Sequence, residues 1–255
     1  MHGEVRTRLF LPQAGSERII TTDEGALDIA RVLKLRKDDL VGLFKDDPFD
    51  YEYRVESVTR RQLVLEYRGR RENTANPQAT CVLVQASGKS GKNEEIVRHG
   101  TALGVTEFLF FRADRSIGRI VFDKAKRLQK IALESCRQCG RSRVPVVALQ
   151  DQGLEPALDG IAKYKPVLIA CIPGNNRALW RTPRENLAEG VVLVIGPEGG
   201  FSPYEHRTLS RKGAHIAGLG PRTLRMELAS VVALALVQSS LNENASRVGS
   251  DPCRY

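Results

Sequence analysis

The chain has 255 residues, of which 42% are hydrophobic and 27% are charged, and its formal net charge is +9. This length and composition are those of a globular protein with one large domain or two modest ones. The first residues lack an apolar run long enough for a signal peptide, and the most apolar later stretch, Leu228 to Val237, is about half a membrane span. We therefore expect neither export nor membrane anchoring. The five cysteines, an odd number without disulfide-framework spacing, fit reduced thiols and a cytoplasmic location.

Residues 1 to about 70 predict short strands around one helix. Thr21 and Glu24 have the spacing of a capping box that opens a helix in TTDEGALDIARVLKL, and apolar runs follow near 40–45, 51–58 and 62–67. The stretch 69–79 is polar, contains a proline and lacks hydrophobic periodicity, so it is the best linker candidate. We expect a small β-rich domain at 1–72, a second domain at 73–245 and a frayed tail at 246–255.

From residue 80 onward, short apolar runs alternate with helical patterns. The runs are CVLVQA, VTEFLFF, VPVVAL, PVLIACI, VVLVIG and HIAGL, and helices are expected over about 94–103, 121–140 and 222–241. This alternation predicts an α/β domain with a parallel sheet, because parallel strands need a crossover connection that is usually a helix.

The positive charge is concentrated after the first 72 residues. Residues 1–72 carry 14 Lys and Arg against 14 Asp and Glu, whereas residues 112–143 carry ten basic side chains against three acidic ones, a local charge of +7. Such clustering favours a polyanionic partner such as RNA. A solvated helix face would have the same composition, so charge alone leaves both interpretations open.

Two motifs that could indicate a nucleotide or metal site have the wrong spacing. ASGKSGKN follows a strand and precedes a helix, but neither of its Gly-Lys pairs has the spacing of a phosphate-binding loop. Lys89 and Lys92 then belong to a flexible basic loop or contact RNA phosphates. Cys136 and Cys139 have no second Cys or His pair at metal-ligand spacing, and the four histidines form no cluster, so we expect no metal.

The segment VVLVIGPEGGFSPYE predicts a strand, a tight glycine loop and a helix start. Ser202 suits the N-cap, Pro203 the first helical position and Glu205 the capping-box partner. At the carboxyl end of a parallel strand, a loop rich in glycine lets backbone groups approach a ligand closely. A purely structural turn would also explain the glycines.

The segment HIAGLGPRTLRMELASVVALAL repeats this arrangement, since a short strand meets two glycines before an apolar helix. Two such loops beside each other could wrap one cofactor. Arg222, Arg225 and Glu227 stand at the mouth of the helix, where an unpaired charge is costly, so they should pair or contact a ligand. An ion pair of Arg225 with Glu198 or Glu227 is the structural alternative.

The sequences IGPEGGFSPYE and LGPRTLRMELA resemble the signature loops of the SPOUT methyltransferases, and most closely those of the RsmE family, which methylates N3 of a uridine in 16S ribosomal RNA. KIALESCRQCGRSRVP is similar to that family's basic helix and loop, Asp114-Arg115-Ser116 to its Glu-Arg-Ser element, and ALDIARVLKLRKDDLVGLF to its N-terminal barrel. The resemblance covers nearly the whole chain. It implies a PUA-like β-barrel followed by a SPOUT domain with a deep trefoil knot, in a homodimer that acts on the 30S subunit.

The resemblance also implies S-adenosylmethionine as the cofactor. Its predicted contacts are Cys171, Ile195, Gly196, Pro197, Glu198, Gly199, Gly200, Leu219, Gly220, Pro221, Leu224 and Arg225. For catalysis we expect Arg225 to stabilise charge or orient the base, with Glu198 or Glu227 positioning it. The candidate RNA contacts are Arg8, Arg31, Lys34, Arg36, Lys89, Lys92, Arg115 and Arg141.

The chain departs from the family pattern at two positions near the second loop. Met226 and Leu228 stand where the family usually has threonine, so any role of those hydroxyls is absent. Two alternatives therefore stay open. One is a SPOUT methyltransferase for another RNA position, such as a ribose 2′-hydroxyl or a transfer RNA, and the other is a non-catalytic RNA-binding homodimer.

Overall fold

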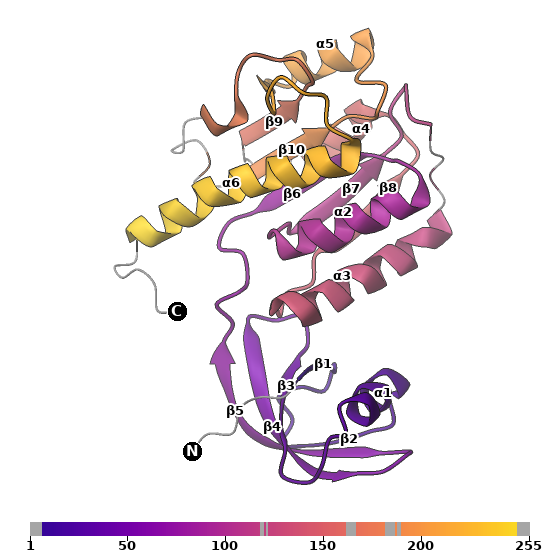
Figure 1. Ribbon diagram of the computed structural model, residues 1–255, viewed down its shortest axis with the longest axis vertical. Coiled ribbons are helices and arrows are strands. Elements are labelled where there is room, and N and C mark those ends of the chain that lie inside the picture. The colour runs from indigo at the N-terminus through magenta and orange to yellow at the C-terminus, as the bar shows by residue number, and fades with distance from the viewer. Residues whose placement is uncertain are drawn as a thin grey trace. The chain divides into compact units, whose positions relative to one another are not determined.

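The computed structural model describes residues 7–117, 120, 122–161, 167–181, 187 and 190–248 (Figure 1). The chain divides into two compact units. One comprises Met1–Asn76 with Cys136–Val144, and the other comprises Pro77–Ser135 with Pro145–Tyr255. Among the described residues no helix is long and apolar enough to cross a membrane, and no group of three or more His, Cys, Asp or Glu could hold a metal ion.

The first unit is built on a five-stranded mixed sheet. In spatial order its strands are β1 (Arg8–Phe10), β3 (Leu40–Phe44), β4 (Phe49–Val58), β5 (Leu63–Glu72) and β2 (Arg18–Thr21). β1 pairs in parallel with β3, and the other neighbours are antiparallel. Helix α1 (Glu24–Val32) buries Ala26, Leu27 and Ala30 in the core of this sheet. The curled sheet is a half-barrel, since no described pairing joins its edge strands β1 and β2.

Helix α1 does not begin with the predicted capping box. Its N-cap is Asp23, whose Oδ1 accepts a hydrogen bond from Ala26 N at 2.8 Å. Thr21 ends β2, and its Oγ1 accepts from Asp23 N at 3.1 Å. Aspartate is as good an N-cap as threonine, and here the residue that directly precedes the helix takes that position.

The predicted linker at 69–79 is partly regular and partly buried. β5 continues to Glu72, and Asn73 and Asn76 are only 5% and 8% exposed. Asn76 Oδ1 accepts from the backbone N–H groups of Ser142 at 3.1 Å and Arg143 at 2.9 Å, and its Nδ2 donates to Ser142 Oγ at 2.8 Å. The first unit therefore includes residues 136–144, which the predicted boundary assigned to the second domain.

The second unit is built on a six-stranded parallel sheet, as the alternating pattern predicts. In spatial order its strands are β11 (His215–Ala217), β9 (Val167–Cys171), β10 (Val191–Ile195), β6 (Cys81–Ala86), β7 (Glu107–Phe111) and β8 (Val146–Gln150). Every neighbouring pair is parallel. The central strands β6 and β10 are buried along their whole length, which explains their almost uninterrupted apolar sequences.

Helices cover both faces of this sheet (Figure 1). α2 (Ser90–Ala102) and α6 (Met226–Val248) lie on one face, where Ser230 Oγ donates to Gln85 Oε1 at 2.6 Å. α4 (Leu154–Gly160) and α5 (Pro203–Arg211) pack on the other face, in the cluster that contains Val82 and Val84. Alternate residues of β6 thus enter different layers. α3 (Ala125–Cys139) connects β7 to β8 after the short 3₁₀ turn η1 (Phe122–Lys124).

Two helix boundaries differ from the prediction. α2 begins at Ser90, earlier than expected, so the second half of the basic loop, residues 90–93, is its first turn. α6 begins at Met226 and continues to Val248, which overlaps the start of the expected tail, and residues 249–255 lie outside the described residues. α5 begins as predicted, since Ser202 caps it, Pro203 opens it and Glu205 completes the capping box.

The strand order reverses between β6 and β10. The chain runs outward from β6 to β7 and β8 and then crosses to β9, on the far side of β10. Cys171 at the end of β9 lies in register with Ile195 of β10 and Ala217 of β11. Ligands of open parallel sheets bind outside the carboxyl ends of strands at such a reversal. The fold therefore indicates a site at the loops after β9, β10 and β11.

The connection after β9 packs closely on the end of β11. Gly218 N–H donates to Arg177 O at 2.7 Å, and Leu179 N–H donates to Gly218 O at 3.0 Å. A β-carbon at Gly218 would lie 2.0 Å from the carbonyl oxygen of Asn175, so only glycine fits there.

Helix α6 leaves the second glycine loop and returns across the sheet. It contacts β10, α2 and the 3₁₀ turn η2 (Leu179–Arg181), which belongs to the connection between β9 and β10. The trefoil knot implied by the family resemblance stays a prediction, because residues 182–186, 188 and 189 of that connection lie outside the described residues.

Replacing Gly218 with alanine should destabilise the protein. The new β-carbon would force a backbone carbonyl to move, so Gly218→Ala should lower the free energy of unfolding by about 2 kcal/mol or more. Gly160→Ala is the matched control, since a β-carbon there meets nothing within 4 Å, and it should stay within about 0.5 kcal/mol of wild type. Urea unfolding measures both, and equal midpoints for the two variants would contradict the expectation.

Candidate functional site

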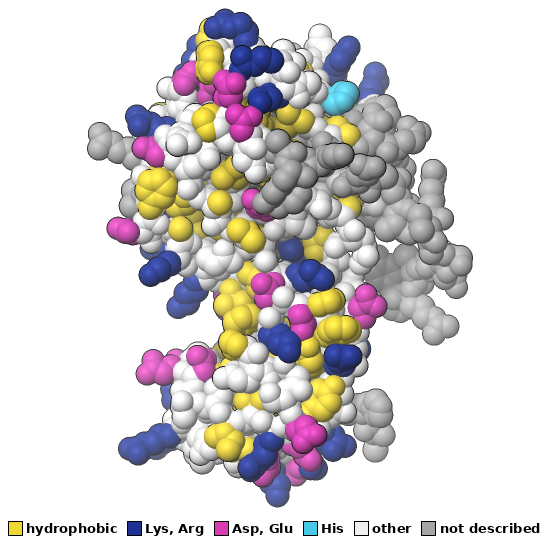
Figure 2. Space-filling model, turned by 180° about the vertical axis from the view of Figure 1, so that it is seen from behind, with side chains coloured by type: hydrophobic (Ala, Val, Ile, Leu, Met, Phe, Trp, Pro, Cys, Tyr) yellow, Lys and Arg dark blue, Asp and Glu magenta, His cyan; other side chains and the backbone are white. Residues whose placement is uncertain are grey.

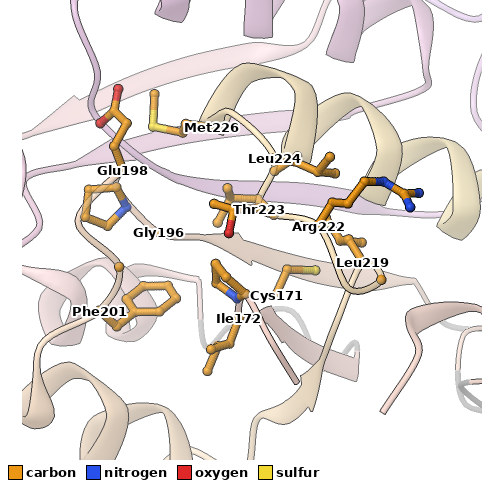
Figure 3. A pocket seen from close by; sticks show the side chains of 16 residues that line it. Cys171, Ile172, Gly196, Glu198, Phe201, Leu219, Arg222, Thr223, Leu224 and Met226 are labelled. Atoms are coloured by element: carbon orange, nitrogen blue, oxygen red, sulfur yellow. The ribbon is translucent and has the colours of Figure 1, made fainter. Parts of the chain in front are cut away.

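A pocket opens at the carboxyl ends of β9, β10 and β11. The space between its walls is about 590 Å³ when the open solvent at the mouth is included. Figure 3 shows Glu198 and Met226 at one end, Arg222 and Leu219 at the other, and Thr223 between them. The lining residues are Cys171, Ile172, Pro173, Ile195, Gly196, Pro197, Glu198, Gly200, Phe201, Leu219, Gly220, Arg222, Thr223, Leu224, Met226 and Ala229.

The first glycine loop turns sharply after β10. Gly200 has a φ of +70°, and its N–H donates to Pro197 O at 2.9 Å. A β-carbon on Gly200 would meet nothing within 4 Å, whereas one on Gly196 would lie 3.0 Å from the ring of Phe201. The loop thus presents backbone to the pocket, with the Phe201 ring packed beneath it.

The second glycine loop forms the opposite wall. Gly220 has a φ of +104°, and a β-carbon there would also meet nothing within 4 Å. A side chain at Gly200 or Gly220 would therefore occupy open space at the pocket rather than protein core. Two facing loops without side chains at these points form a cradle in which backbone N–H and C=O groups can hold a ligand.

The wall between the loops is apolar and uncharged. Cys171 is 6% exposed, and burial raises the pKa of its thiol to about 12, so the thiol is neutral at physiological pH. Ile172, Ile195 and Leu224 line the same pocket. Such a surface suits the flat base of a nucleoside-like cofactor, with the loops supplying polar contacts.

The pocket contains most of the predicted cofactor residues. All of them line it except Gly199, Pro221 and Arg225. Arg222, which was expected to pair or contact a ligand, also lines the pocket, and the lining residues that the sequence analysis missed are Ile172, Pro173, Phe201, Thr223, Met226 and Ala229. The sequence could have indicated them, because each stands within a few positions of a predicted residue on the same loop or strand end.

Lys92 joins the first glycine loop to the start of α6 at the edge of the pocket, which we call the pocket mouth. Its Nζ lies 2.7 Å from Glu198 Oε1 on the first loop and 3.4 Å from Glu227 Oε2 in the first turn of α6. The hydrogen bond from Lys92 holds the pKa of Glu198 below its usual range, and the same bond raises the pKa of Lys92. Lys92 was predicted as an RNA contact, but the structure commits its ammonium group to two carboxylates.

Arg225 is exposed and does not form the considered ion pair with Glu198 or Glu227. Both carboxylates pair with Lys92, which is 106 residues from Glu198 in the chain. The sequence analysis considered Arg225 because it is nearer to both glutamates in the chain. The packing of α2 beside α6, which brings Lys92 to them, could not be deduced from sequence spacing. Arg225 stands directly before α6, where its carbonyl accepts from Ala229 N at 2.8 Å.

The Asp114-Arg115-Ser116 segment is attached to the first loop. Ser202 Oγ donates to Asp114 Oδ2 while it caps α5, and Asp114 N donates to Glu205 Oε1 at 3.1 Å. Arg115 Nη1 donates to Gly199 O at 3.1 Å. Glu205 is only 1% exposed, so the capping box that begins α5 also anchors this segment.

Two predicted RNA contacts are structural residues of the first unit. Arg8 Nη2 lies 2.5 Å from Asp50 Oδ1, and Arg8 Nη1 donates to the carbonyls of Cys136 at 3.1 Å and Arg141 at 3.2 Å. Arg141 itself is 3% exposed. Arg8 is thus held by contacts within the first unit and Arg141 is buried, and the predicted RNA contacts at both positions stay predictions.

The other predicted RNA contacts are exposed. Arg31 pairs with Asp28 at 2.7 Å across one helical turn, and the remaining exposed candidates are Lys34, Arg36, Lys89 and Arg115. On the face shown in Figure 2, Lys and Arg side chains are interspersed with Asp and Glu rather than gathered in one continuous basic field. The exposed candidates stay predictions.

Comparison with known proteins identifies the family of this chain. Residues 74–238, which include the whole pocket, match the family described as RNA methyltransferase domain. The chain belongs to this family. The RsmE resemblance is confirmed as well, since the curated relatives carry the name ribosomal RNA small subunit methyltransferase E. The relative from Bacillus subtilis is 29% identical over 85% of this chain and 88% of its own, and that from Mycobacterium tuberculosis is 28% identical over 89% and 88%.

Solved structures support the same fold. A protein from Legionella pneumophila, whose structure was solved in complex with the bound cofactor SAM, is 26% identical and superposes with a TM-score of 0.82 over 92% of this chain and 98% of its own. The ribosomal RNA small subunit methyltransferase E of Neisseria gonorrhoeae, bound to S-adenosyl methionine, is 23% identical with the same TM-score over 91% and 97%. The predicted α/β SPOUT-type fold is therefore confirmed, with a half-barrel in the first unit.

The bridge between Lys92 and Glu198 should give stability a specific pH dependence. Because the pKa of Glu198 is lowered on folding, its contribution is present at neutral pH and is lost as pH falls through that lowered pKa. Glu198→Gln should therefore lower the urea midpoint at pH 7, and the difference from wild type should shrink towards pH 4. Glu95→Gln, an exposed site on α2 with no described ion pair, is the control and should show no such trend. A difference that does not vary with pH would contradict this account.

Proposed function

We propose that this chain is an S-adenosylmethionine-dependent methyltransferase that methylates N3 of one uridine in 16S ribosomal RNA, with the 30S subunit as substrate. The observation that carries the proposal is the pocket between the two glycine loops, at the carboxyl ends of β9, β10 and β11, which lie in register. The names of the curated relatives support the small-subunit RNA, and the Legionella structure supports the cofactor. The uridine N3 position rests on the resemblance to the RsmE family.

The pocket residues fit this cofactor. The neutral wall around Cys171 and Ile195 suits the adenine, and the open positions above Gly200 and Gly220 leave room beside the backbone. When bound, the cofactor supplies a methyl group activated by a sulfonium, and its transfer is an in-line displacement. The residues of the chain have to align the donor with the RNA base and exclude water.

Uridine N3 is a weakly acidic imide, so its proton must pass to a base or to water when the methyl group is transferred, and a group that stabilises the resulting anion assists this step. Positioned acid-base groups are typically worth about 10² to 10⁴ in rate. In the proposed mechanism the exposed Arg225 stabilises the developing negative charge or orients the base. Glu198 and Glu227 shape the charge at the pocket mouth, where Lys92 holds them.

The proposal includes a cytoplasmic homodimer. Leu228 in the first turn of α6 is 48% exposed, and burial against a second copy would remove this apolar surface from water. The family resemblance implies the same assembly. Exposed basic side chains of the first unit, Arg31, Lys34 and Arg36, are the proposed contacts to RNA phosphates.

Nucleoside mapping tests the reaction directly. Purified protein is incubated with S-adenosylmethionine and 30S subunits from a strain that lacks it, and the 16S RNA is analysed by mass spectrometry. We expect 3-methyluridine at a single site. Subunits from a strain that contains the protein are the matched control and should gain no methyl group. A methyl group on a ribose or another nucleotide would refute the uridine N3 assignment, and cofactor binding without any transfer would favour the non-catalytic alternative.

The proposed RNA surface has its own test. Arg36→Gln should weaken binding to 16S RNA and reduce the slope of log affinity against log salt by about 0.7–0.9, the effect of one lost phosphate contact. Arg18→Gln is the charge-matched control, because Glu56 already neutralises Arg18 through two hydrogen bonds of 2.8 Å. Filter binding between 50 mM and 200 mM salt measures both, and equal slopes for the two variants would argue against Arg36.

A further inference from the structure

The loop between β6 and α2 packs against the start of α6, beside the pocket. Asn93 fixes this loop, since its Oδ1 accepts from Gly88 N at 3.0 Å and its Nδ2 donates to Ser87 Oγ at 3.1 Å. A β-carbon at Gly88 would lie 2.4 Å from the methyl carbon of Met226, a residue that lines the pocket. The loop therefore lies directly against the start of α6, and Lys92 in the first turn of α2 reaches both glutamates.

Lys92 also sets the net charge of this cluster. Glu198 and Glu227 carry two negative charges, and the single ammonium group reduces their sum to −1. Glu227 Oε2 is buried and makes no hydrogen bond among the described residues, so the ammonium group at 3.4 Å is its counter-ion. Without Lys92 the pocket mouth would carry two close and partly buried carboxylates of like charge.

We propose that Lys92 is a positioning residue for methyl transfer, which ties the first glycine loop to the start of α6 and holds the charge of the cluster that it forms with Glu198 and Glu227 at −1. This inference rests on the proposed methyltransferase function. Transfer removes the positive charge of the sulfonium, so excess negative charge at the mouth favours the bound reactant over the transition state and the neutral product. Lys92 limits this excess of negative charge, and it also fixes the distance between the first glycine loop and the start of α6.

The test compares the cationic cofactor with its neutral product, S-adenosylhomocysteine. In Lys92→Met the cluster charge becomes −2, so calorimetry should show a preference for S-adenosylmethionine over S-adenosylhomocysteine that is larger than in wild type by roughly fivefold or more at low salt. Lys92→Arg keeps the charge and should retain the wild-type ratio. Lys130→Met removes an exposed lysine of α3 and is the control for a change in overall charge.

A double variant separates charge from position. Lys92→Met with Glu227→Gln restores the cluster charge to −1, so the ratio of the two affinities should return towards wild type. The turnover number should stay low in this variant, because the tie between the loop and α6 is still missing. Turnover is measured on 30S subunits, and thermal melting confirms that each variant is folded.

The outcomes of the two proposals are distinguishable. An unchanged affinity ratio and unchanged turnover in Lys92→Met would overturn the role of Lys92 and leave the methyltransferase proposal intact. Absence of transfer by wild-type protein would overturn the methyltransferase proposal, whereas the affinity ratio would still report whether Lys92 sets the charge of the mouth. A ratio that fails to recover in the double variant would overturn the charge argument.

Discussion

The parallel register of β9, β10 and β11 is the constraint on which the site depends. Cys171, Ile195 and Ala217 end at the same level, so the loops that follow them meet at one edge of the sheet. The connection after β9 then packs so closely on β11 that Gly218 has no room for a side chain. Backbone groups form this contact, since Gly218 bonds to Arg177 O and Leu179 N.

Charge at the pocket mouth comes from three separate elements. Glu198 belongs to the first loop, Glu227 to α6 and Lys92 to α2, and only the packing of α2 beside α6 brings them together. The cluster of these three side chains has a net charge of −1, whereas Arg222 at the other end of the pocket is basic.

Basic side chains have two different functions in this protein. Arg8 and Arg141 stabilise the first unit, since Arg8 joins Asp50 to the carbonyls of residues 136 and 141 and Arg141 is buried. Lys34 and Arg36 are exposed and available to a partner. Composition counts all of them equally, and only burial separates structural cations from those that can meet a phosphate.

The sequence by itself determined the elements whose signals are local. Uninterrupted apolar runs specified the buried parallel strands, and the order Ser202, Pro203 and Glu205 specified the start of α5, because capping and strand burial act over a few residues. The two glycine loops, which are also local signals, predicted most of the residues that line the pocket. Only the tertiary structure decided that residues 136–144 join the first unit and that Lys92, not Arg225, pairs with the two glutamates. These contacts join segments far apart in the chain. Which residues become partners depends on how the helices and strands pack, and this packing cannot be read from residue type and spacing.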